Sequence, residues 1–330
     1  MPEIGPGLAV VLLLILGAEF VNGWTDAPNA IATVISTRAL SPLQAVVMAS
    51  VLNLVGVLSG TAVAATIGKG IIDTSAVDLT TVAGAMVGII AWSSAAARFG
   101  IPTSESHALV AGLAGAGLAT AGPGVLLGEG WKKVALGLVF STFLGFLGGI
   151  VIITLIFWTF KNAAPGRVRG LFRWLQVFSS GFMAFSHGSN DGQKFMGTFS
   201  MALVLGGVLP AFRIPFWVIL LCASVMALGT MTGGWRIIRT MGMRLTKLET
   251  HQGFAAEIAA ASTITLASRL GIPLSTTHTI STAIVGVGAA RGISAVRWGV
   301  TARIVLAWVL TFPVCALISF AVVKAAGLFF

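Results

Sequence analysis

A short polar phrase occurs twice in this hydrophobic chain. Residues 20–33 read FVNGWTDAPNAIAT and residues 185–198 read FSHGSNDGQKFMGT, with Phe, Gly, Asp and Thr in register. The two aspartates, Asp26 and Asp191, are 191 − 26 = 165 residues apart, which is half of the 330 residues. Two related halves that each place a carboxylate in an apolar setting are typical of membrane transporters. The repeated phrase therefore predicts both a fold class and a kind of function.

The composition is that of a polytopic membrane protein. Hydrophobic residues make up 56% of the chain and charged residues only 9%, and the mean hydropathy is +0.98. A soluble domain of this length would carry far more charge. Long apolar stretches reach or approach the length that crosses about 30 Å of hydrocarbon at about 1.5 Å per residue. They cover residues 7–21, 43–67, 82–97, 134–160, 216–231 and 300–323.

A second phrase is also duplicated. Residues 99–107 read FGIPTSESH and residues 270–278 read LGIPLSTTH. Their histidines, His107 and His278, are 278 − 107 = 171 residues apart, close to the offset of the first phrase, so both phrases belong to one large repeat. We expect a first transmembrane repeat over residues 1–160, a basic cytoplasmic linker over 161–173 and a second transmembrane repeat over 174–330.

These features predict an all-α polytopic membrane protein with two inverted-topology repeats, because alternating access follows directly from inversion. We expect roughly 10 to 12 membrane segments when broken or re-entrant half-helices are counted. The stretches 29–38 and 194–207 are short for full spans. They are interpreted as half-helices that follow a break at each Asp motif.

The charge pattern indicates how the chain lies in its membrane. Basic residues cluster at 161–173 and at 236–247, and such clusters are typical of cytoplasmic loops rather than of nucleic-acid binding. No basic residue precedes Arg38, so the first apolar segment lacks the charged start of a cleavable signal peptide. We expect a retained first helix that starts outside the cytoplasm, in a multi-pass protein of a plasma membrane, here a bacterial inner membrane.

The second phrase has the chemistry of an anion site. Gly-Ile-Pro followed by hydroxyl residues predicts a break and then a helix N-terminus, where hydroxyls cap free backbone amides. Free amides, the positive end of the helix and hydroxyl donors together bind oxyanions. The alternative is that these hydroxyls only cap helix ends. The side chains concerned are Ser104, Ser106, Ser275, Thr276 and Thr277.

The two aspartates are candidates for holding a coupling cation. An ionised carboxylate at membrane depth costs about 2.5 to 3.5 kcal/mol and usually faces a cavity, a partner or an ion. Because carboxylates repel a dianion, Asp26 and Asp191 are expected to hold a proton or a metal ion beside the substrate. Asn29 and Asn190 can add neutral ligands or donors. No cofactor is predicted, since neither a metal-ligand spacing nor a nucleotide-binding loop is visible.

Three cationic or titratable side chains complete the predicted site. His107 and His278 are interpreted as buried hydrogen-bonding groups, phosphate donors or proton carriers. By the 165-residue offset Lys194 replaces Asn29, so it either substitutes for a sodium ion or simply pairs with Asp191. The predicted substrate site comprises Asp26, Asn29, Ser104, Ser106, Asn190, Asp191, Lys194, Ser275, Thr276 and Thr277. The predicted coupling residues are Asp26, Asn29, Asp191, His107 and His278.

These residues resemble a known family, the inorganic phosphate transporters called PiT. Its signatures lie near the start of each half and are matched by GWTDAPN at 23–29 and GSNDGQK at 188–194. The flanking AIATVISTRAL at 30–40, the two Pro-x-Ser-x-x-His phrases and GTMTGGWR at 229–236 are also similar. The resemblance covers nearly the whole chain.

The resemblance implies uptake of inorganic phosphate by an inverted-repeat helical fold. The second signature is similar to that of a prokaryotic proton-coupled branch, which is associated with neutral metal–phosphate complexes as well. Sodium-coupled members resemble the Asn form in both halves. Two positions depart from the family pattern: Pro28 stands where a small Ala is usual, and Thr25 replaces the Asn found beside Asp in many members.

Several interpretations compete at this point. A cation-coupled phosphate symporter, with the proton favoured over sodium, accounts for both duplicated phrases. A transporter of sulfate or another oxyanion is the nearest alternative, but a carboxylate repels an oxyanion that has no proton to donate. An intramembrane hydrolase is disfavoured, because catalysis needs one asymmetric nucleophile and base whereas this chain has near-duplicate sets. We therefore predict a transporter and not an enzyme.

A homodimer is a further expectation. Gly145, Gly148 and Gly149 form a run of small residues that would allow outer helices of two subunits to approach closely. The same glycines could instead pack helices within one subunit.

Overall fold

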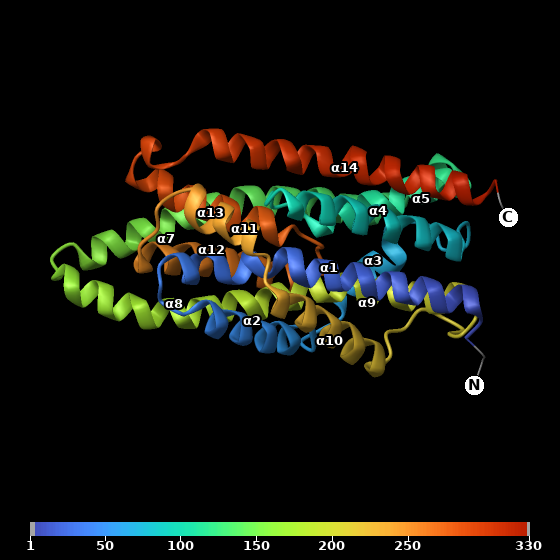
Figure 1. The fold of residues 1–330 in the computed structure, drawn as a ribbon, viewed down its shortest axis with the longest axis horizontal. Coiled ribbons are helices and arrows are strands. Elements are labelled where there is room, and N and C mark those ends of the chain that lie inside the picture. The colour runs from blue at the N-terminus through green and yellow to red at the C-terminus, as the bar shows by residue number, and fades with distance from the viewer. Residues whose placement is uncertain (1–3, 329–330) are drawn as a thin grey trace.

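The computed structural model describes residues 4–328, which form a bundle of long helices (Figure 1). Within this range the only β-type pairing is an isolated bridge between Ile72 and Leu126. Three π-helical turns, Phe140–Leu144, Gly188–Gly192 and Thr240–Arg244, extend neighbouring helices. The helices are α1 Pro6–Ser36, α2 Pro42–Val57, α3 Ala62–Gly70, α4 Leu79–Arg98, α5 Glu105–Ala121, α6 Gly128–Val139, α7 Gly145–Phe160, α8 Pro165–His187, α9 Gln193–Leu205, α10 Phe216–Thr232, α11 Trp235–Arg239, α12 Thr250–Arg269, α13 Thr276–Arg291 and α14 Trp298–Ala326.

Four helical stretches within residues 4–328 have the length and composition of membrane spans. Two bent pairs, α2 with α3 at 69° and α10 with α11 and its π turn at 60°, would bring the number of such spans to six. The prediction of an all-α polytopic membrane protein is confirmed. The predicted 10 to 12 segments also counted short stretches and broken or re-entrant half-helices, and α5, α9 and α13 are short helices of 17, 13 and 16 residues. The four single stretches that qualify are Pro6–Ser36, Leu79–Arg98, Gly128–Phe160 and Trp298–Ala326.

Both Asp phrases lie inside long helical stretches. α1 continues through Asp26 and Pro28, and α8 continues through the π turn at Asp191 directly into α9. The predicted breaks at these motifs are therefore wrong. A proline inside a membrane helix removes one backbone hydrogen bond, which the surrounding helices can compensate, and a π turn widens a helix without ending it.

Two helical hairpins carry the second phrase. α4 and α5 form one hairpin, and α12 and α13 form the other. In each hairpin the Gly-Ile-Pro segment lies in the connection between the two helices. Gly100 and Gly271 adopt φ angles of +68° and +64°, in the left-handed region that favours glycine. The helices that follow begin at Glu105 and Thr276, so the predicted break followed by a helix N-terminus is confirmed.

The hairpins enter the bundle from opposite ends. α5 runs back toward the end where α1 starts, whereas α13 lies toward the end that carries the α7–α8 connection (Figure 1). Their tips meet inside, where Ser106 Oγ donates to the carbonyl oxygen of Leu274 at 2.7 Å. Each tip is also held by a threonine of the neighbouring bent helix pair. Thr240 Oγ1 donates to Gly100 O at 2.7 Å, and Thr66 Oγ1 donates to Gly271 O at 2.8 Å.

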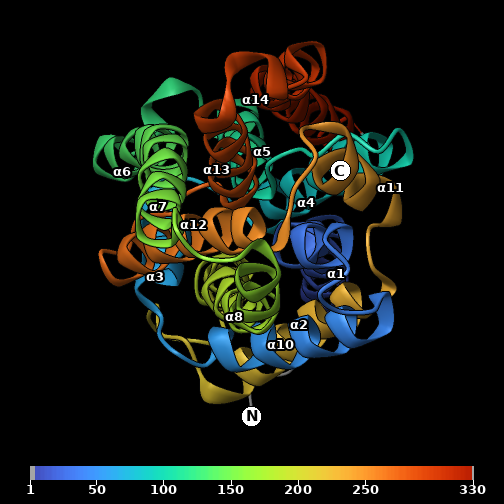
Figure 2. The same cartoon turned by 90° about the vertical axis from the view of Figure 1, so that its left-hand side faces the viewer.

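The polar motifs lie in the middle of the bundle. Viewed end-on, α12 lies between α8 and α13, with α1 beside them, and α14, α7 and the pair α2 and α10 are peripheral (Figure 2). Two separate clusters of buried hydrophobic side chains pack the bundle, one including Ile15 and Leu109 and the other Ile31 and Ile280. Because α1 contributes to both clusters, Asp26 lies on α1 between them.

The α7–α8 region contains both the predicted linker and the glycines considered for a dimer contact. α8 begins at Pro165, so most of the expected linker 161–173 forms the first turns of a helix. The three glycines proposed for a dimer contact pack inside this chain, since a Cβ added to Gly149 would lie 2.5 Å from Ala283 O on α13. Gly145 faces α13 and Gly148 faces α12 in the same way. These contacts agree with the alternative that the glycines pack helices within one subunit, and the dimer itself stays a prediction.

Candidate functional site

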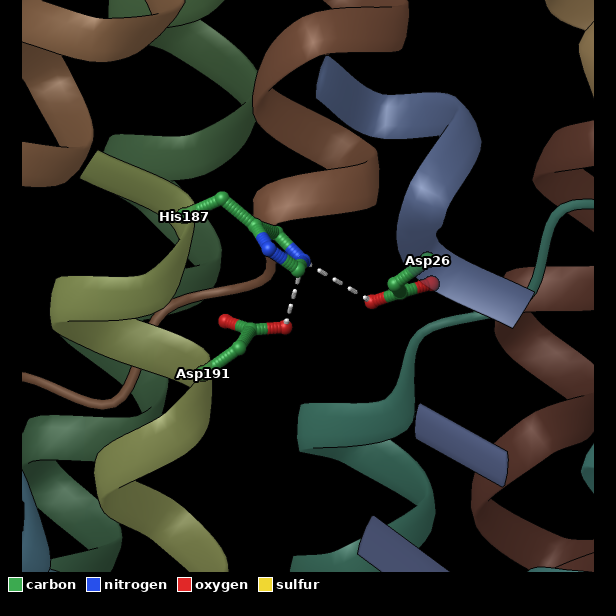
Figure 3. Close-up of side chains that lie close together, drawn as sticks. All are labelled: Asp26, His187 and Asp191. Carbon is green, nitrogen blue, oxygen red and sulfur yellow. Dashed lines mark ion pairs between the residues drawn. The ribbon is translucent and has the colours of Figure 1, made fainter. Parts of the chain in front are cut away.

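The two repeated aspartates face each other across a buried histidine. Asp26 comes from α1, and Asp191 from the π turn that joins α8 and α9. His187, one helical turn before Asp191, lies between them (Figure 3). Its Nε2 atom is 3.5 Å from Asp191 Oδ2 and 3.9 Å from Asp26 Oδ2. All three residues are at most 2% exposed, so the site is closed to solvent and lipid.

This trio has the geometry of a cation site. One ligand atom from each of Asp26, His187 and Asp191 lies within 4.8 Å of the others. His187 Nδ1 is 3.1 Å from the side-chain oxygen of Asn53. In the neutral ring that contact places the hydrogen on Nδ1 and leaves the Nε2 lone pair facing the carboxylates. Asp26 Oδ2 and His187 Nε2 have no hydrogen-bond partner within residues 4–328, so both can serve as ligands.

The sequence prediction did not include His187. Two signals could have found it. It lies four residues before Asp191, which places both side chains on one face of a helix, and it corresponds to Asn22 at the 165-residue offset. Asn22 donates to Glu19 at 3.0 Å, and the hydrogen bonds and ion pairs of the two aspartates within residues 4–328 do not include it.

Lys194 is the cation of the site. Its Nζ atom lies 2.5 Å from Asp191 Oδ1, and the lysine is 1% exposed. It also donates to Ser106 at the tip of the first hairpin and to Leu274 O at the tip of the second, at 3.0 Å. Lys194 therefore connects the second aspartate to both hairpins.

Asn29 makes different contacts at the equivalent position in the first copy. Its amide donates to Thr277 Oγ1 at 3.0 Å and to Thr276 Oγ1 at 3.3 Å. Those two threonines in turn donate to the aspartates, Thr276 to Asp191 at 3.0 Å and Thr277 to Asp26 at 3.2 Å. The start of α13 is thus bound to both aspartates at once.

Two of the predicted hydroxyls act as helix caps. Ser104 Oγ accepts a hydrogen bond from His107 N at 3.2 Å, and Ser275 Oγ accepts one from His278 N at 3.1 Å. Asn190 also has a bracing contact, since its amide donates to Ser268 at 3.0 Å and to Ile272 O at 3.2 Å. These side chains hold the hairpin tips in place in this conformation.

The two repeated histidines contact each other. The rings of His107 and His278 meet edge to face with centroids 4.6 Å apart, and His278 stacks on Trp308 of α14 at 3.8 Å. His107 also lies against Phe312, at 4.8 Å. Within residues 4–328 the basic side chains that lie within 4 Å of the two aspartates are those of Lys194 and His187, not these histidines. They form a contact between the hairpin tips and α14.

The arrangement joins two kinds of binding chemistry. The aspartates and His187 supply ligands for a cation. The starts of α5 and α13 supply hydroxyls and free backbone amides, and Lys194 supplies a fixed positive charge, for an oxyanion. In this conformation the hydroxyls and the aspartates hydrogen bond to one another.

Comparisons with known proteins agree with this chemistry. The chain matches the phosphate transporter family over residues 22–319. A probable low-affinity inorganic phosphate transporter of Rhizobium meliloti is 46% identical over 316 residues, or 95% of each chain. Another of that description, from Bacillus subtilis, is 37% identical over 310 residues, or 93% of each chain. A solved structure described as the sodium-dependent phosphate transporter has a TM-score of 0.84 and 26% identity over 99% of this chain and 100% of that one. The chain belongs to the phosphate transporter family.

Proposed function

We propose that this protein is a secondary active transporter that takes up inorganic phosphate together with a cation, the proton being favoured. The observation that carries the proposal is the convergence of Asp26, His187 and Asp191 with the hydroxyl-bearing starts of α5 and α13 in one buried site. The hydrolase interpretation is abandoned, because the family and the relatives are transporters.

Phosphate would bind at the hairpin tips. Ser106, Thr276 and Thr277 would exchange their present partners for phosphate oxygens, as hydroxyl and amide donors at helix starts do for anions. The carboxylates favour phosphate over sulfate, because phosphate retains a proton that it can donate to them. A divalent metal ion carried in with phosphate would fit the three ligand atoms of Asp26, His187 and Asp191.

The choice of coupling ion depends on the difference between the two copies. Lys194 supplies a fixed charge at the position where Asn29 offers a neutral oxygen, which leaves fewer neutral ligands for sodium. This favours proton or metal coupling. The alternative, sodium coupling, has one observation in its favour, namely the likeness to a structure described as sodium-dependent.

We propose alternating access between two inverted repeats, covering residues 1–160 and 174–330 on either side of the stretch 161–173. Hairpins that enter from opposite ends support it, since each would close the site from one side (Figure 1). The basic α7–α8 connection would lie in the cytoplasm of a bacterial cell, which places the start of α1 outside. Two side cavities flank the site, one of about 660 Å³ beside Trp24, Arg98 and Trp235, and one of about 290 Å³ beside Ser189, Gln193 and Arg269.

The test is radiolabelled phosphate uptake into proteoliposomes that contain the purified protein. An inward proton gradient is compared with an inward sodium gradient, with excess unlabelled sulfate and with added magnesium. Proton-driven uptake that resists sulfate supports the proposal, and stimulation by magnesium supports a metal–phosphate complex as the cargo. If uptake requires sodium, sodium and not the proton is the coupling ion. If unlabelled sulfate blocks phosphate uptake, the proposed selectivity for phosphate over sulfate is wrong.

A further inference from the structure

A third buried carboxylate lies beside the site. Glu105 is the first residue of α5, at the tip of the first hairpin, and it is 1% exposed. Its Oε1 atom accepts from Thr25 Oγ1 at 3.0 Å and its Oε2 atom from Ser93 Oγ at 2.8 Å. Within residues 4–328 Glu105 forms no ion pair with a lysine, arginine or histidine. Glu105 is thus buried with hydroxyl partners and no counter-ion in contact.

The hydroxyl of Thr25 has one hydrogen for two acceptors. Its Oγ1 atom is 2.8 Å from Val21 O and 3.0 Å from Glu105 Oε1. A threonine hydroxyl carries one hydrogen and two lone pairs. Both contacts become full hydrogen bonds when Thr25 donates to Val21 O and accepts from a protonated Glu105. The geometry around Glu105 therefore has a place for a proton.

The second half lacks this carboxylate. By the 171-residue offset Glu105 corresponds to Thr276, because 276 − 171 = 105, and Thr276 donates to Asp191 instead. Glu105 reaches Asp26 indirectly, through Thr25, the residue before it on α1. Thr25 is one of the two departures from the family pattern noted in the sequence. The first half therefore has a carboxylate where the second has a threonine, and a hydroxyl on α1 that contacts it.

The charges around Glu105 are mostly negative. Each ionised carboxylate is costly at membrane depth. Several carboxylates inside a closed site therefore need either protons bound to them or positively charged partners. Lys194 is the nearby fixed cation, and it is already paired with Asp191. The titratable groups close enough to interact with Glu105 are Glu19 and Asp26 on α1, Asp191 in the π turn and Cys315 on α14, together with its helix neighbour His107 and with Lys194, which contacts Ser106.

We propose that Glu105 is the proton-binding site that couples phosphate uptake to the proton gradient, an inference that rests on the proposed phosphate transport. Glu105 occupies the first turn of α5, where the oxyanion would bind. An ionised carboxylate there repels phosphate and a protonated one does not, so each ligand strengthens the binding of the other. The proton enters from the outer solution with phosphate and is released to the cytoplasm with it, and no other bond is made or broken.

The test compares two transport modes in Glu105→Gln. Glutamine keeps the size of glutamate and offers Thr25 a donor, so it imitates the protonated state. In exchange, with phosphate on both sides of the membrane, we expect Glu105→Gln to run close to the wild-type rate and to lose the pH dependence of the wild type. In net uptake, an inward gradient of about 2 pH units supports about 100-fold accumulation per coupled proton. We expect that accumulation to fall to about onefold in the variant.

Matched variants complete the design. Glu105→Asp keeps the carboxylate and is expected to retain proton-driven accumulation, and Glu129→Gln removes an exposed carboxylate as a control. Proton-driven accumulation by Glu105→Gln at the wild-type level overturns the inference and leaves phosphate transport intact. Loss of both exchange and accumulation in Glu105→Gln also overturns it, because the role would then be structural. If the wild-type protein takes up phosphate without proton coupling, both the role of Glu105 and proton symport are overturned.

Discussion

The two copies of the aspartate motif have the same position and different partners. Asp26 lies in an uninterrupted helix, has Asn29 one turn away and keeps one oxygen without a partner among residues 4–328. Asp191 lies in a π turn between His187 and Lys194 and is ion-paired at 2.5 Å. The second half thus carries a built-in cation, whereas the first half leaves a carboxylate oxygen available to a mobile one. A duplicated site can in this way keep one binding position fixed and use the other for coupling.

The largest expected effect follows from removing the built-in cation. Lys194→Met leaves Asp191 buried without its partner and removes the contacts of Lys194 with both hairpins. We expect a loss of stability of about 3 to 5 kcal/mol, typical of breaking a buried ion pair, and loss of uptake. Thermal unfolding in detergent and proteoliposome uptake measure the two effects.

A double variant separates charge from packing. Lys194→Met combined with Asp191→Asn removes both charges, so it should recover much of the lost stability without recovering uptake. Lys194→Asn makes the second copy resemble the first and is expected to change the ion dependence of transport. If Lys194→Asn transports normally with the same ion dependence, the two copies are not divided between fixed and mobile cations.

The next effect distinguishes the two aspartates. Asp26→Asn removes the carboxylate that we propose binds the mobile cation, and no lysine within residues 4–328 loses an ion pair by the change. We expect uptake to fall by about 10- to 100-fold, the range seen when a metal site loses a supporting group, with little change in unfolding temperature. Asp191→Asn should lower both uptake and stability, because Lys194 loses its partner. Equal loss of stability in the two variants would contradict the comparison.

A smaller effect is expected for His187. His187→Asn gives the second copy the residue that the first copy has at Asn22, and it removes one of three grouped ligand atoms. We expect stimulation of phosphate uptake by magnesium or manganese to weaken by about tenfold, while uptake without added metal changes less. His187→Ala with added imidazole is the companion measurement. Metal stimulation that is the same in His187→Asn and wild type would remove His187 from the cation site.

The sequence predicted those parts of the site that depend on local chemistry. Gly-Ile-Pro followed by Ser or Thr forms a break and a capped helix start whatever surrounds it, and both hairpin tips have this form. The duplication at similar offsets of 165 and 171 residues predicted that the two tips and the two aspartates belong together. Composition was sufficient for the all-helical membrane class.

What the sequence missed depends on tertiary packing. A break was predicted at the Asp motif that contains Pro28, but α10 and the following glycines pack against this part of α1, and a Cβ on Gly234 would lie 3.0 Å from the Pro28 ring. Gly149 was assigned to a subunit contact because a small residue looks the same whether it meets its own chain or another. His187 and Glu105 were quoted within the motifs but had no role, since their value comes from partners on other helices, Asn53 and Thr25.

The smallest expected effect concerns the pair in which the halves differ least. Ser104 and Ser275 cap α5 and α13 through the same contact, to His107 N and His278 N. Ser104→Ala and Ser275→Ala should each cost about 1 kcal/mol of stability, the usual effect of losing an N-cap, and should leave the affinity for phosphate nearly unchanged. Ser41→Ala is the matched control, because Ser41 caps α2 outside the site. A rise in the KM for phosphate in only one of the two serine variants would show that the hydroxyl of that serine leaves the cap to bind the substrate. The two hairpin tips, which are alike in this conformation, would then contribute unequally to phosphate binding, as the two aspartates are expected to contribute unequally to cation binding.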